Sequence, residues 1–403
     1  TQTKAMETET WLKSEIDKDC QIFIKPLQLT DPTDYSLILP QARQAVTAVL
    51  KELSQAECEF HLNCSSGTPQ LKSIWVILAN SGVIKNCQLW QVANPDFSKE
   101  TRVRKLEVTF LEEENILARI KKYSQEFLFQ RIAEECELLK EISLYSYRKE
   151  KAGLVARIFM AYHYWDLIRY DEAYRRLSSV FSSDVRSALD LRDMAQILKA
   201  QVEVLARLKD NSAMENNYNL IDLYFNAWRR KIKGDFTDTL ARFWRIYEGA
   251  LFMHLRSRYR LEPRDLSQSS DKKCAEMLVE SLNLNRMKKG LSIATASKAL
   301  EEILRDKLYR RVSEKIIPAK RESSMQNLKI AEILSELRGK RNESIVAHGM
   351  RPVSEDDAVN ALQAAKVLLL EFIPDAHELL EDYPLNQGKM QKVLETLDKS
   401  FAL

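Results

Sequence analysis

The pattern of hydrophobic and polar positions changes once along the chain, near residue 112. Before that point, short apolar runs alternate with helical patterns and polar turns, as in a sheet whose strands are joined by helices. We expect strands at 21–25, 58–64, 87–92 and 103–110, and helices over 42–53 and 71–79. Because strand, turn, helix and strand follow one another in this order, the crossover should be right-handed and the sheet parallel.

After residue 112, strand patterns give way to long amphipathic runs. These runs predict helices over roughly 115–140, 153–167, 171–180, 184–208, 214–231, 235–259, 271–282, 293–315, 325–347 and 354–372. The predicted fold class is therefore α/β plus all-α, with a parallel sheet at the N-terminal end and helices alone after it.

The composition is that of an ordinary globular protein, with 403 residues, 45% of them hydrophobic and 30% charged. A net charge of +3 excludes a strongly basic coat for nucleic acid but allows a local basic groove. Neither a signal peptide nor an apolar run near 18 residues is present, so we expect no membrane span and a cytoplasmic protein. The six cysteines form no C-x-x-C pair and the five histidines are scattered, which predicts reduced thiols and no metal site.

A polar turn at residues 65–70 follows the second expected strand and leads into an apolar helix. Ligands of doubly wound sheets bind beyond the carboxyl ends of strands. The turn offers three hydroxyl groups, and Gly67 would let the backbone approach a ligand closely. The free N–H groups of the next helix would favour phosphate. The alternative is a plain connection in which a serine or threonine caps the helix.

The stretch Arg341 to Gly349 places a permanent cation and an imidazole seven residues apart. In one continuous helix, seven residues are almost two turns, so Arg341 and His348 would share a face about 10 Å apart along the axis. Gly349 would stop that helix. Such a face suits a groove for RNA; the alternative is a solvated helix end with a capping histidine.

If this groove holds RNA, the side chains suit metal-independent cleavage by the RNA's own 2′-hydroxyl. His348 would act as general acid or base, and Arg341 would neutralise charge on the phosphoryl oxygens. The products would be a 2′,3′-cyclic phosphate and a 5′-hydroxyl. The separation of the two groups suggests that a second copy, related by a two-fold axis, completes the cleft.

These residues also carry a family resemblance. Arg341-Asn342-x5-His348 resembles the R-x4–6-H signature of HEPN ribonucleases. The turn and its next residue, Ser65 to Leu71, resemble the ligand loop [ST]-x-G-T-x-x-M of CRISPR-associated Rossmann-fold (CARF) domains, with Leu71 in place of methionine. The segment 234–248 also resembles the opening helix of the HEPN region in such proteins.

The resemblance implies a CARF–HEPN effector of type III CRISPR antiviral defence. It implies a Rossmann-like CARF domain at 1–112, a helical middle region at 113–210 and a helical HEPN ribonuclease domain at 211–403. A CARF domain normally begins with a strand and a second ligand loop, so we expect its first strands to be missing here. Cyclic oligoadenylate, the expected activator, would switch on cleavage of single-stranded RNA by a homodimer, with no cofactor.

Carried over residue by residue, the messenger contacts are Ser65, Ser66, Gly67, Thr68 and Gln70, and the catalytic residues are Arg341 and His348, with Asn342 in support. Some family members also degrade their messenger, and the sequence leaves this open here. One alternative is a non-catalytic nucleotide sensor that binds RNA or a partner. Another is a helical-repeat scaffold with an incidental α/β domain.

Two further sets of residues have more than one interpretation. The aromatic side chains could form a base-stacking platform, but their helical spacing favours core packing. These are Phe225, Trp228, Phe243, Trp244 and Tyr247. A basic set could guide RNA, although a solvated helical face is the simpler interpretation. It comprises Lys288, Lys289, Arg305, Lys307, Arg310 and Arg311.

Overall fold

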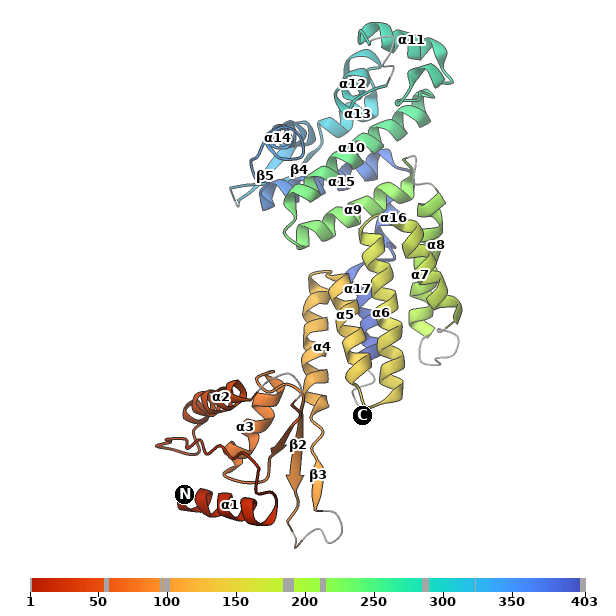
Figure 1. Ribbon diagram of the computed structural model, residues 1–403. Helices are drawn as coiled ribbons and strands as arrows, with labels where there is room; N and C mark the ends of the chain where they lie inside the picture. The colour runs from red at the N-terminus through yellow and green to blue at the C-terminus, as the bar shows by residue number, and fades with distance from the viewer. Residues whose placement is uncertain are drawn as a thin grey trace. The chain divides into compact units, whose positions relative to one another are not determined.

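The protein is described from a computed structural model, which covers residues 2–53, 58–94, 96, 102–183, 192–210, 215–284, 290–322 and 324–398. The chain divides into two compact units, Thr1–Asn115 and Ile116–Leu403 (Figure 1). Lys288 and Lys289 lie outside the described residues. No helix in the described part of the chain is long and apolar enough to cross a membrane.

The first unit has a small mixed sheet and three helices. Its elements are α1 (Gln2–Glu15), α2 (Tyr35–Glu52), β1 (Phe60–Asn63), α3 (Pro69–Asn80), β2 (Cys87–Val92) and β3 (Val103–Lys105). Strands β1 and β2 pair in parallel, with Leu62 opposite Leu89, while β3 runs antiparallel to β2. The predicted parallel crossover from β1 through α3 to β2 is confirmed, but the sheet as a whole is mixed.

The core of this unit lies where α2 and α3 pack together, around Ile38, Ile74 and Leu78. The strand predicted at 21–25 is wrong: that segment is irregular and mostly exposed. An apolar run becomes a strand only when it pairs with a sheet edge, and no such pairing is made by 21–25. The strand predicted at 103–110 is limited to three residues, and the next helix begins at Thr109.

The second unit begins with antiparallel helices that pack in chain order: α5 on α6, α6 on α7, and α7 on α8. The helices of this part are α4 (Thr109–Gln125), α5 (Phe129–Ile142), α6 (Ser146–Asp166), α7 (Tyr170–Ser183) and α8 (Arg192–Asp210). The single helix predicted over 115–140 is two helices, since Phe127 has a left-handed φ of 54°. The C-terminal helix α17 (Gln387–Asp398) returns to pack on α6 and α8.

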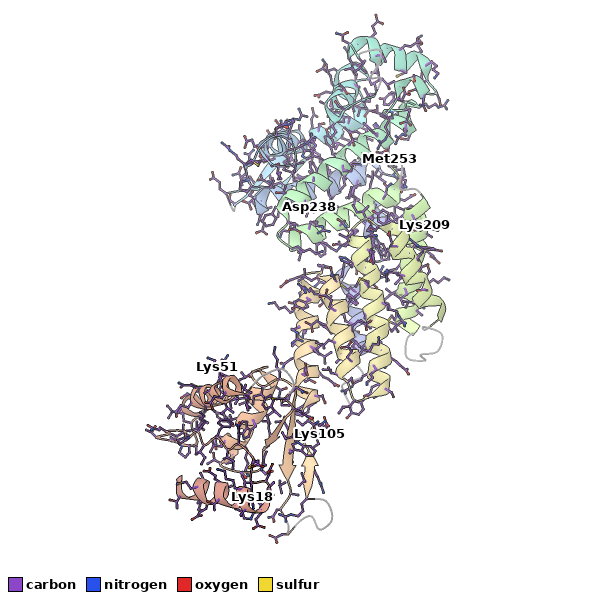
Figure 2. All side chains as sticks on the ribbon, in the orientation of Figure 1. Lys18, Lys51, Lys105, Lys209, Asp238 and Met253 are labelled. Atoms are coloured by element: carbon purple, nitrogen blue, oxygen red, sulfur yellow. The ribbon has the colours of Figure 1, made fainter. Side chains whose placement is uncertain are left out.

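Three long helices form the centre of the remaining part: α9 (Asn217–Ile232), α10 (Phe236–Tyr259) and α15 (Glu355–Phe372). Asp238 and Met253, labelled in Figure 2, mark the first turn and the C-terminal half of α10. The shorter helices are α11 (Lys272–Ser281), α12 (Ile293–Lys298), α13 (Lys307–Ser313), α14 (Ile330–Glu343) and α16 (Ala376–Glu381). A 3-10 turn (Leu266–Gln268) and a π-helical turn (Ala299–Ile303) complete this part.

A β-hairpin interrupts the helices, so the expectation of an all-helical region after residue 112 is wrong. Strands β4 (Ile316–Arg321) and β5 (Ser324–Lys329) pair antiparallel, and β4 packs on α15. The side chain of Asn360 on α15 accepts from the N–H of Lys320 at 2.7 Å and donates to its carbonyl at 2.8 Å. The helices predicted over 293–315 and 325–347 each span a break in the observed structure.

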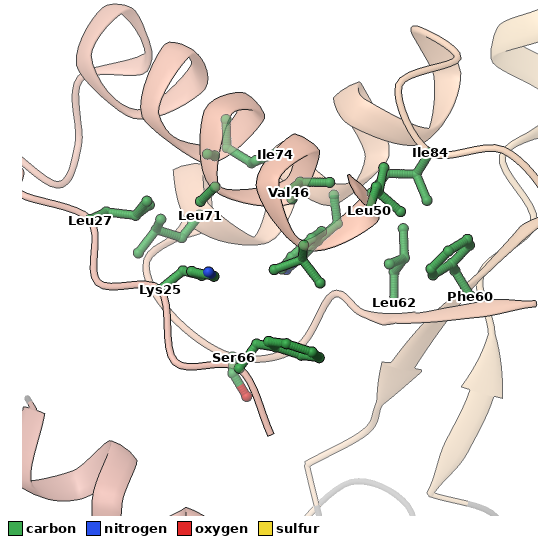
Figure 3. Close-up of a pocket in the computed structure, with 15 residues that line it drawn as sticks. Lys25, Leu27, Val46, Leu50, Phe60, Leu62, Ser66, Leu71, Ile74 and Ile84 are labelled. Atoms are coloured by element: carbon green, nitrogen blue, oxygen red, sulfur yellow. The ribbon is translucent and has the colours of Figure 1, made fainter. Parts of the chain in front are cut away.

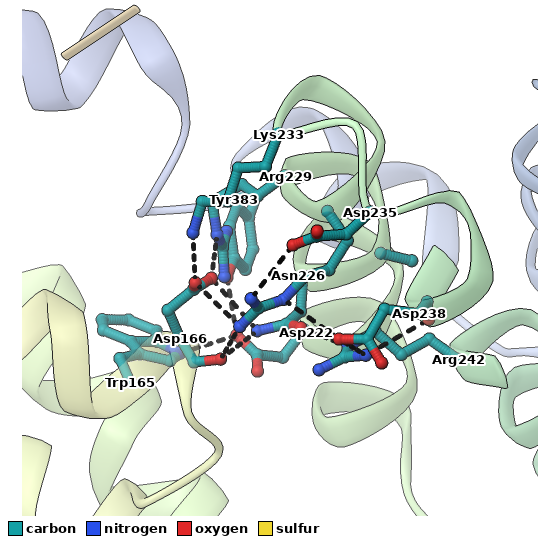
Figure 4. A network of polar contacts seen from close by, with 12 residues as sticks. Trp165, Asp166, Asp222, Asn226, Arg229, Lys233, Asp235, Asp238, Arg242 and Tyr383 are labelled. Atoms are coloured by element: carbon teal, nitrogen blue, oxygen red, sulfur yellow. Dashed lines mark hydrogen bonds and ion pairs between the residues drawn. The ribbon is translucent and has the colours of Figure 1, made fainter. Parts of the chain in front are cut away.

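A buried carboxylate joins α6 to α9. Asp166, at the end of α6, accepts from Arg229 at 2.8 Å, Lys233 at 2.6 Å and Arg230 at 3.1 Å (Figure 4). Burial by itself raises the pKa of this carboxyl, but the three cations outweigh it and lower the pKa to about 2.

A second buried carboxylate, Asp222 on α9, lies beside the first (Figure 4). It accepts from the Trp165 indole at 2.7 Å, the Tyr170 hydroxyl at 2.9 Å and the Tyr383 hydroxyl at 2.6 Å. Burial raises the pKa of Asp222 in spite of these donors. The two carboxylates therefore tie α6, α9 and the C-terminal segment together.

Candidate functional site

The residues Arg341, Asn342 and His348 lie on the last turn of α14 and the loop after it. Helix α14 ends at Glu343, and Ser344 is its C-cap in extended conformation. Arg341 and His348 are therefore not on one continuous helix, and the prediction that they share a helical face is wrong. His348 is carried by a turn over residues 345–348 and is exposed, as is Asn342.

Ser344 ends the helix because its side chain competes for the backbone. Its hydroxyl donates to the carbonyl of Arg341 at 3.0 Å and accepts from the N–H of Val346 at 3.3 Å. Its own carbonyl accepts from the N–H groups of Ala347 and Gly349, each at 3.1 Å. Serine is favoured in such local bonds over a helix interior. The buried Ser344 thus organises the loop that presents His348.

Gly349 does not have the role predicted for it as the residue that stops the helix. Its backbone passes so close to the end of α14 that a Cβ atom would lie 1.8 Å from the carbonyl oxygen of Glu343. The same oxygen accepts from the N–H of Arg351 at 2.9 Å. Only glycine fits this approach, which folds the loop back against the helix end.

Arg341 is half-buried against α10. The carbon of its guanidinium lies 5.5 Å from the ring centroid of Trp244, within the range of a cation–π contact. Trp244 is 4% exposed, and Arg341 Nε has no hydrogen-bond partner among the described residues. The aromatic ring therefore fixes the guanidinium from one side, and its donors remain available for an anion.

The turn at 65–70 connects β1 to α3, and two of its side chains make hydrogen bonds within the fold. Thr68 is the N-cap of α3: its hydroxyl oxygen accepts from the N–H of Leu71 at 3.3 Å and its hydroxyl donates to the carbonyl of Pro32 at 3.1 Å. The Ser65 hydroxyl accepts from the N–H of Val92, which ties the turn to β2. The capping interpretation of Thr68 is thus confirmed.

Three other residues of the turn, Ser66, Gly67 and Gln70, have features that suit contact with a ligand. Gly67 has a φ of 99°, which other residues rarely adopt. Ser66 is exposed, and Gln70 Oε1 is buried without a hydrogen-bond partner in the described structure. A buried acceptor without a donor costs free energy unless a ligand or water supplies one. Ser66 and Gln70 are therefore the side chains of the turn best placed to take a ligand.

An apolar cavity of about 470 Å³ lies beside the turn, between α2, α3 and the segment before α2 (Figure 3). Val46, Leu50 and Leu71 are among its lining residues, to which Lys25 adds a charge and Ser66 a hydroxyl group. Phosphates need donors and charge, so this cavity is the wrong kind of surface for them. In the described residues, no group of three or more His, Cys, Asp and Glu side chains could hold a metal ion.

The comparisons with known proteins match a segment that contains the motif near Arg341. Residues 208–372 match the family described as the Csm6 HEPN domain. This segment is therefore similar to the HEPN domain of Csm6 proteins. No curated protein sequence matches the chain. The resemblance to CARF–HEPN proteins that the sequence motifs indicated is thereby confirmed.

A solved structure of Enterococcus italicus Csm6, bound to cyclic hexa-2′-fluoro-hexa-dAMP, has a similar fold. The two align over 96% of this chain and 86% of the other, with a TM-score of 0.56 and 15% sequence identity. At this level of identity the likeness shows the fold alone. The mostly helical architecture with small sheets is therefore that of Csm6.

Within residues 208–372, two residues at the site are not indicated by the sequence motifs. Trp244 was assigned to the core by its helical spacing, and it is indeed buried, but it also faces Arg341. Ser344 lies inside the helix predicted over 325–347 but is the C-cap of α14. Its signal was the sequence Ser-Ile-Val, in which a serine precedes two β-branched residues that favour helices weakly.

Proposed function

We propose that the protein is a metal-independent endoribonuclease of type III CRISPR defence, activated by cyclic oligoadenylate and acting in the cytoplasm. The observation that carries the proposal is the match of residues 208–372 to the Csm6 HEPN domain, with Arg341, Asn342 and His348 near its C-terminal end. The Asn342 amide and the His348 imidazole are exposed, and Nε of the Arg341 guanidinium has no hydrogen-bond partner among the described residues, as suits groups that meet a substrate.

The proposed reaction is attack of a ribose 2′-oxygen on the adjacent phosphorus. The 2′-hydroxyl loses its proton, the new O–P bond forms, and the 5′-oxygen of the next nucleotide leaves with a proton. His348 transfers these protons, and the Arg341 guanidinium neutralises the charge on the non-bridging oxygens. Asn342 supports them by a hydrogen bond to the phosphate. The products are a 2′,3′-cyclic phosphate and a 5′-hydroxyl.

One chain supplies one His348, whereas the reaction needs both a base and an acid. A homodimer with two HEPN domains about a two-fold axis supplies two imidazoles and two guanidinium groups to one cleft. The exposure of His348, on a loop that makes no hydrogen bond through this side chain in the described structure, is what such an arrangement requires.

The activator is proposed to bind at the turn that includes Ser65, Ser66, Gly67, Thr68 and Gln70. The ligand in the Csm6 structure is a cyclic adenylate analogue, and its presence there motivates the same class here. Ser66 and Gln70 have free capacity for adenine or ribose groups, while Ser65 and Thr68 shape the turn. In this proposal residues 1–112 are the CARF domain and 211–403 the HEPN domain, joined by a helical middle region.

The test is a fluorogenic single-stranded RNA assayed with and without cyclic oligoadenylates of different ring size, in the presence of EDTA. We expect cleavage only with a matching ring, and none for His348→Ala, with a cyclic phosphate end found by mass spectrometry. His377→Ala is the matched control, because His377 is an exposed histidine on α16, outside the matched segment. If the unsubstituted protein never cuts with any ring, yet its melting temperature rises with one, it is a sensor rather than an enzyme.

A further inference from the structure

A basic groove lies on the HEPN domain, apart from Arg341 and His348. Its first part is a hollow of about 610 Å³ between the C-terminal end of α10 and α13. Its second part is an open hollow of about 720 Å³ between α13 and α15. Lys307 and Arg311 line both hollows, so the two are continuous. We call them together the α13 groove.

The groove concentrates positive charge. Its lining holds six cations: Arg258, Arg305, Lys307, Arg310, Arg311 and Lys315. The carboxylates that line it are three, Asp306, Glu314 and Glu371, so its balance is 6 − 3 = +3. The whole chain has a net charge of only +3. A surface this basic on a nearly neutral protein indicates an anionic partner.

Most of these cations have no carboxylate of their own. Arg311 and Lys315 pair with Glu371 at 3.0 Å and 2.6 Å. Asp306 is buried, and its carboxylate already makes hydrogen bonds with His254, Tyr259 and the N–H of Tyr309. In the described residues, no ion pair is made by Arg258, Arg305, Lys307 or Arg310, all of which are exposed. Four cations are therefore free to contact a ligand.

The floor of the groove is rigid, which distinguishes it from a solvated helical face. Asp306 is clamped to α10, since it accepts from the Tyr259 hydroxyl at 2.7 Å and lies 3.1 Å from His254 Nε2. Arg305 and Lys307 flank this anchored residue, and Arg305 adopts a left-handed φ of 48°. Their side chains thus leave from a fixed backbone, and less freedom is lost when they bind.

The spread of the cations suits a polymer of phosphates better than a single anion. They are distributed over two hollows, and the rings among the lining residues, Tyr259 and His254, are both engaged with Asp306. Base stacking is therefore limited, and contact with a nucleic-acid backbone through Arg and Lys is independent of sequence. Single-stranded RNA is the polyanion that the proposed function brings to this domain.

The groove lies well away from Arg341. Along α10, Trp244 contacts Arg341 and His254 lines the groove, and ten residues of helix correspond to about 15 Å. Along α14, the N–H of Ile330 donates to the carbonyl of Lys315, and Arg341 follows eleven residues later, about 17 Å of rise. The two distances, along α10 and along α14, agree. One RNA could therefore contact both the groove and Arg341 only if it spans several nucleotides between them.

We propose that the α13 groove binds the phosphate backbone of the RNA substrate several nucleotides from the cleaved bond. This inference rests on the proposed ribonuclease function and adds a second contact to it. The groove would raise affinity for long RNA and leave the chemical step unchanged, because its cations do not touch the reacting phosphate.

The test compares Arg305→Gln/Arg310→Gln with a control, Arg131→Gln/Lys140→Gln, whose two cations are exposed at the two ends of α5. Activated cleavage is measured on a long RNA and on the shortest RNA that the unsubstituted protein still cuts. We expect KM for the long RNA to rise about tenfold with kcat unchanged, and neither constant to change for the short RNA. An equal loss on both lengths, or no change on the long RNA, would overturn the proposal.

A binding measurement separates this inference from the proposed function. In a His348→Ala background, fluorescence anisotropy of the long RNA is followed against salt concentration. Loss of two phosphate contacts should reduce the slope of log K against log salt by about 1.4. If the unsubstituted protein cuts no RNA, the proposed function fails, and this measurement alone decides whether the groove binds RNA.

Discussion

At the scale of single residues, the loop after α14 determines where His348 can act. Ser344 closes the helix with its hydroxyl, and Gly349 folds the chain back so closely that a side chain would collide with the carbonyl of Glu343. A catalytic imidazole displaced by about 1 Å can lose a factor of 10² in rate. The geometry of this loop is therefore as important to the proposed reaction as the identity of His348.

Gly349→Ala tests that dependence. The added Cβ cannot be accommodated 1.8 Å from a backbone oxygen, so residues 344–349 must move. We expect activated RNA cleavage to fall by about 10²-fold while the melting temperature changes little, because the loop is at the surface. The readouts are the cleavage rate at saturating messenger and differential scanning fluorimetry.

The control for this substitution is Gly339→Ala, on the helix that precedes the loop. A Cβ at Gly339 would meet nothing within 4 Å, and alanine should stabilise the helix by about 0.5–1 kcal/mol. Its cleavage rate should match that of the unsubstituted protein. Full activity of Gly349→Ala would mean that the loop does not position His348.

At the scale of elements, hydrophobic periodicity predicted most helices but not where they end. Arg341 and His348 were placed on one helix face because an apolar pattern continues through Ile345 and Val346, whereas a side-chain bond from Ser344 stops the helix. The hairpin of β4 and β5 was missed for a related reason. Its strands gain partners from one another and from Asn360, forty residues away, which no local pattern reveals.

The turn at 65–70 also combines features that local sequence signals predict with features that depend on tertiary contacts. The strand, turn and helix around residues 58–79 were predictable, because Thr68 and Pro69 are local signals for a helix start. Tertiary packing, by contrast, determines that the Ser65 hydroxyl accepts a hydrogen bond from the N–H of Val92. It also leaves Gln70 Oε1 without a donor among the described residues. The same is true of the α13 groove, whose cations come from α10 and from the residues around α13.

The junction of α6 and α9 should be sensitive to acid through Asp166. Its pKa is lowered from an ordinary value of 3.8 to about 2, so the folded state releases this proton more readily than the unfolded chain. The stabilisation is fully present above about pH 4 and is lost as the pH falls towards 2. A shift of this size corresponds to about 2 kcal/mol. Urea unfolding followed by circular dichroism at several pH values measures it.

In Asp166→Asn, the three cations lose their carboxylate, and we expect the protein to be less stable by about 3 kcal/mol at pH 7. Its stability should also depend less on pH between 4 and 2. Asp171→Asn is the control, because Asp171 is an exposed carboxylate on α7 that pairs with Arg175 at 2.8 Å. A pH dependence of Asp166→Asn as steep as that of the unsubstituted protein would contradict the assignment.

At the scale of the whole molecule, the proposed site is incomplete in one chain, and dilution with inactive subunits tests this. Subunits with Arg341→Ala and His348→Ala are co-expressed in equal amount with unsubstituted subunits, and mixed dimers are purified by two different tags. If one cleft needs both pairs, mixed dimers are inactive and the random mixture retains about one quarter of the activity. If each chain has its own cleft, mixed dimers are half as active and the mixture retains about one half. Light scattering on each preparation confirms the dimer, and a monomer that still cuts RNA would exclude the composite cleft.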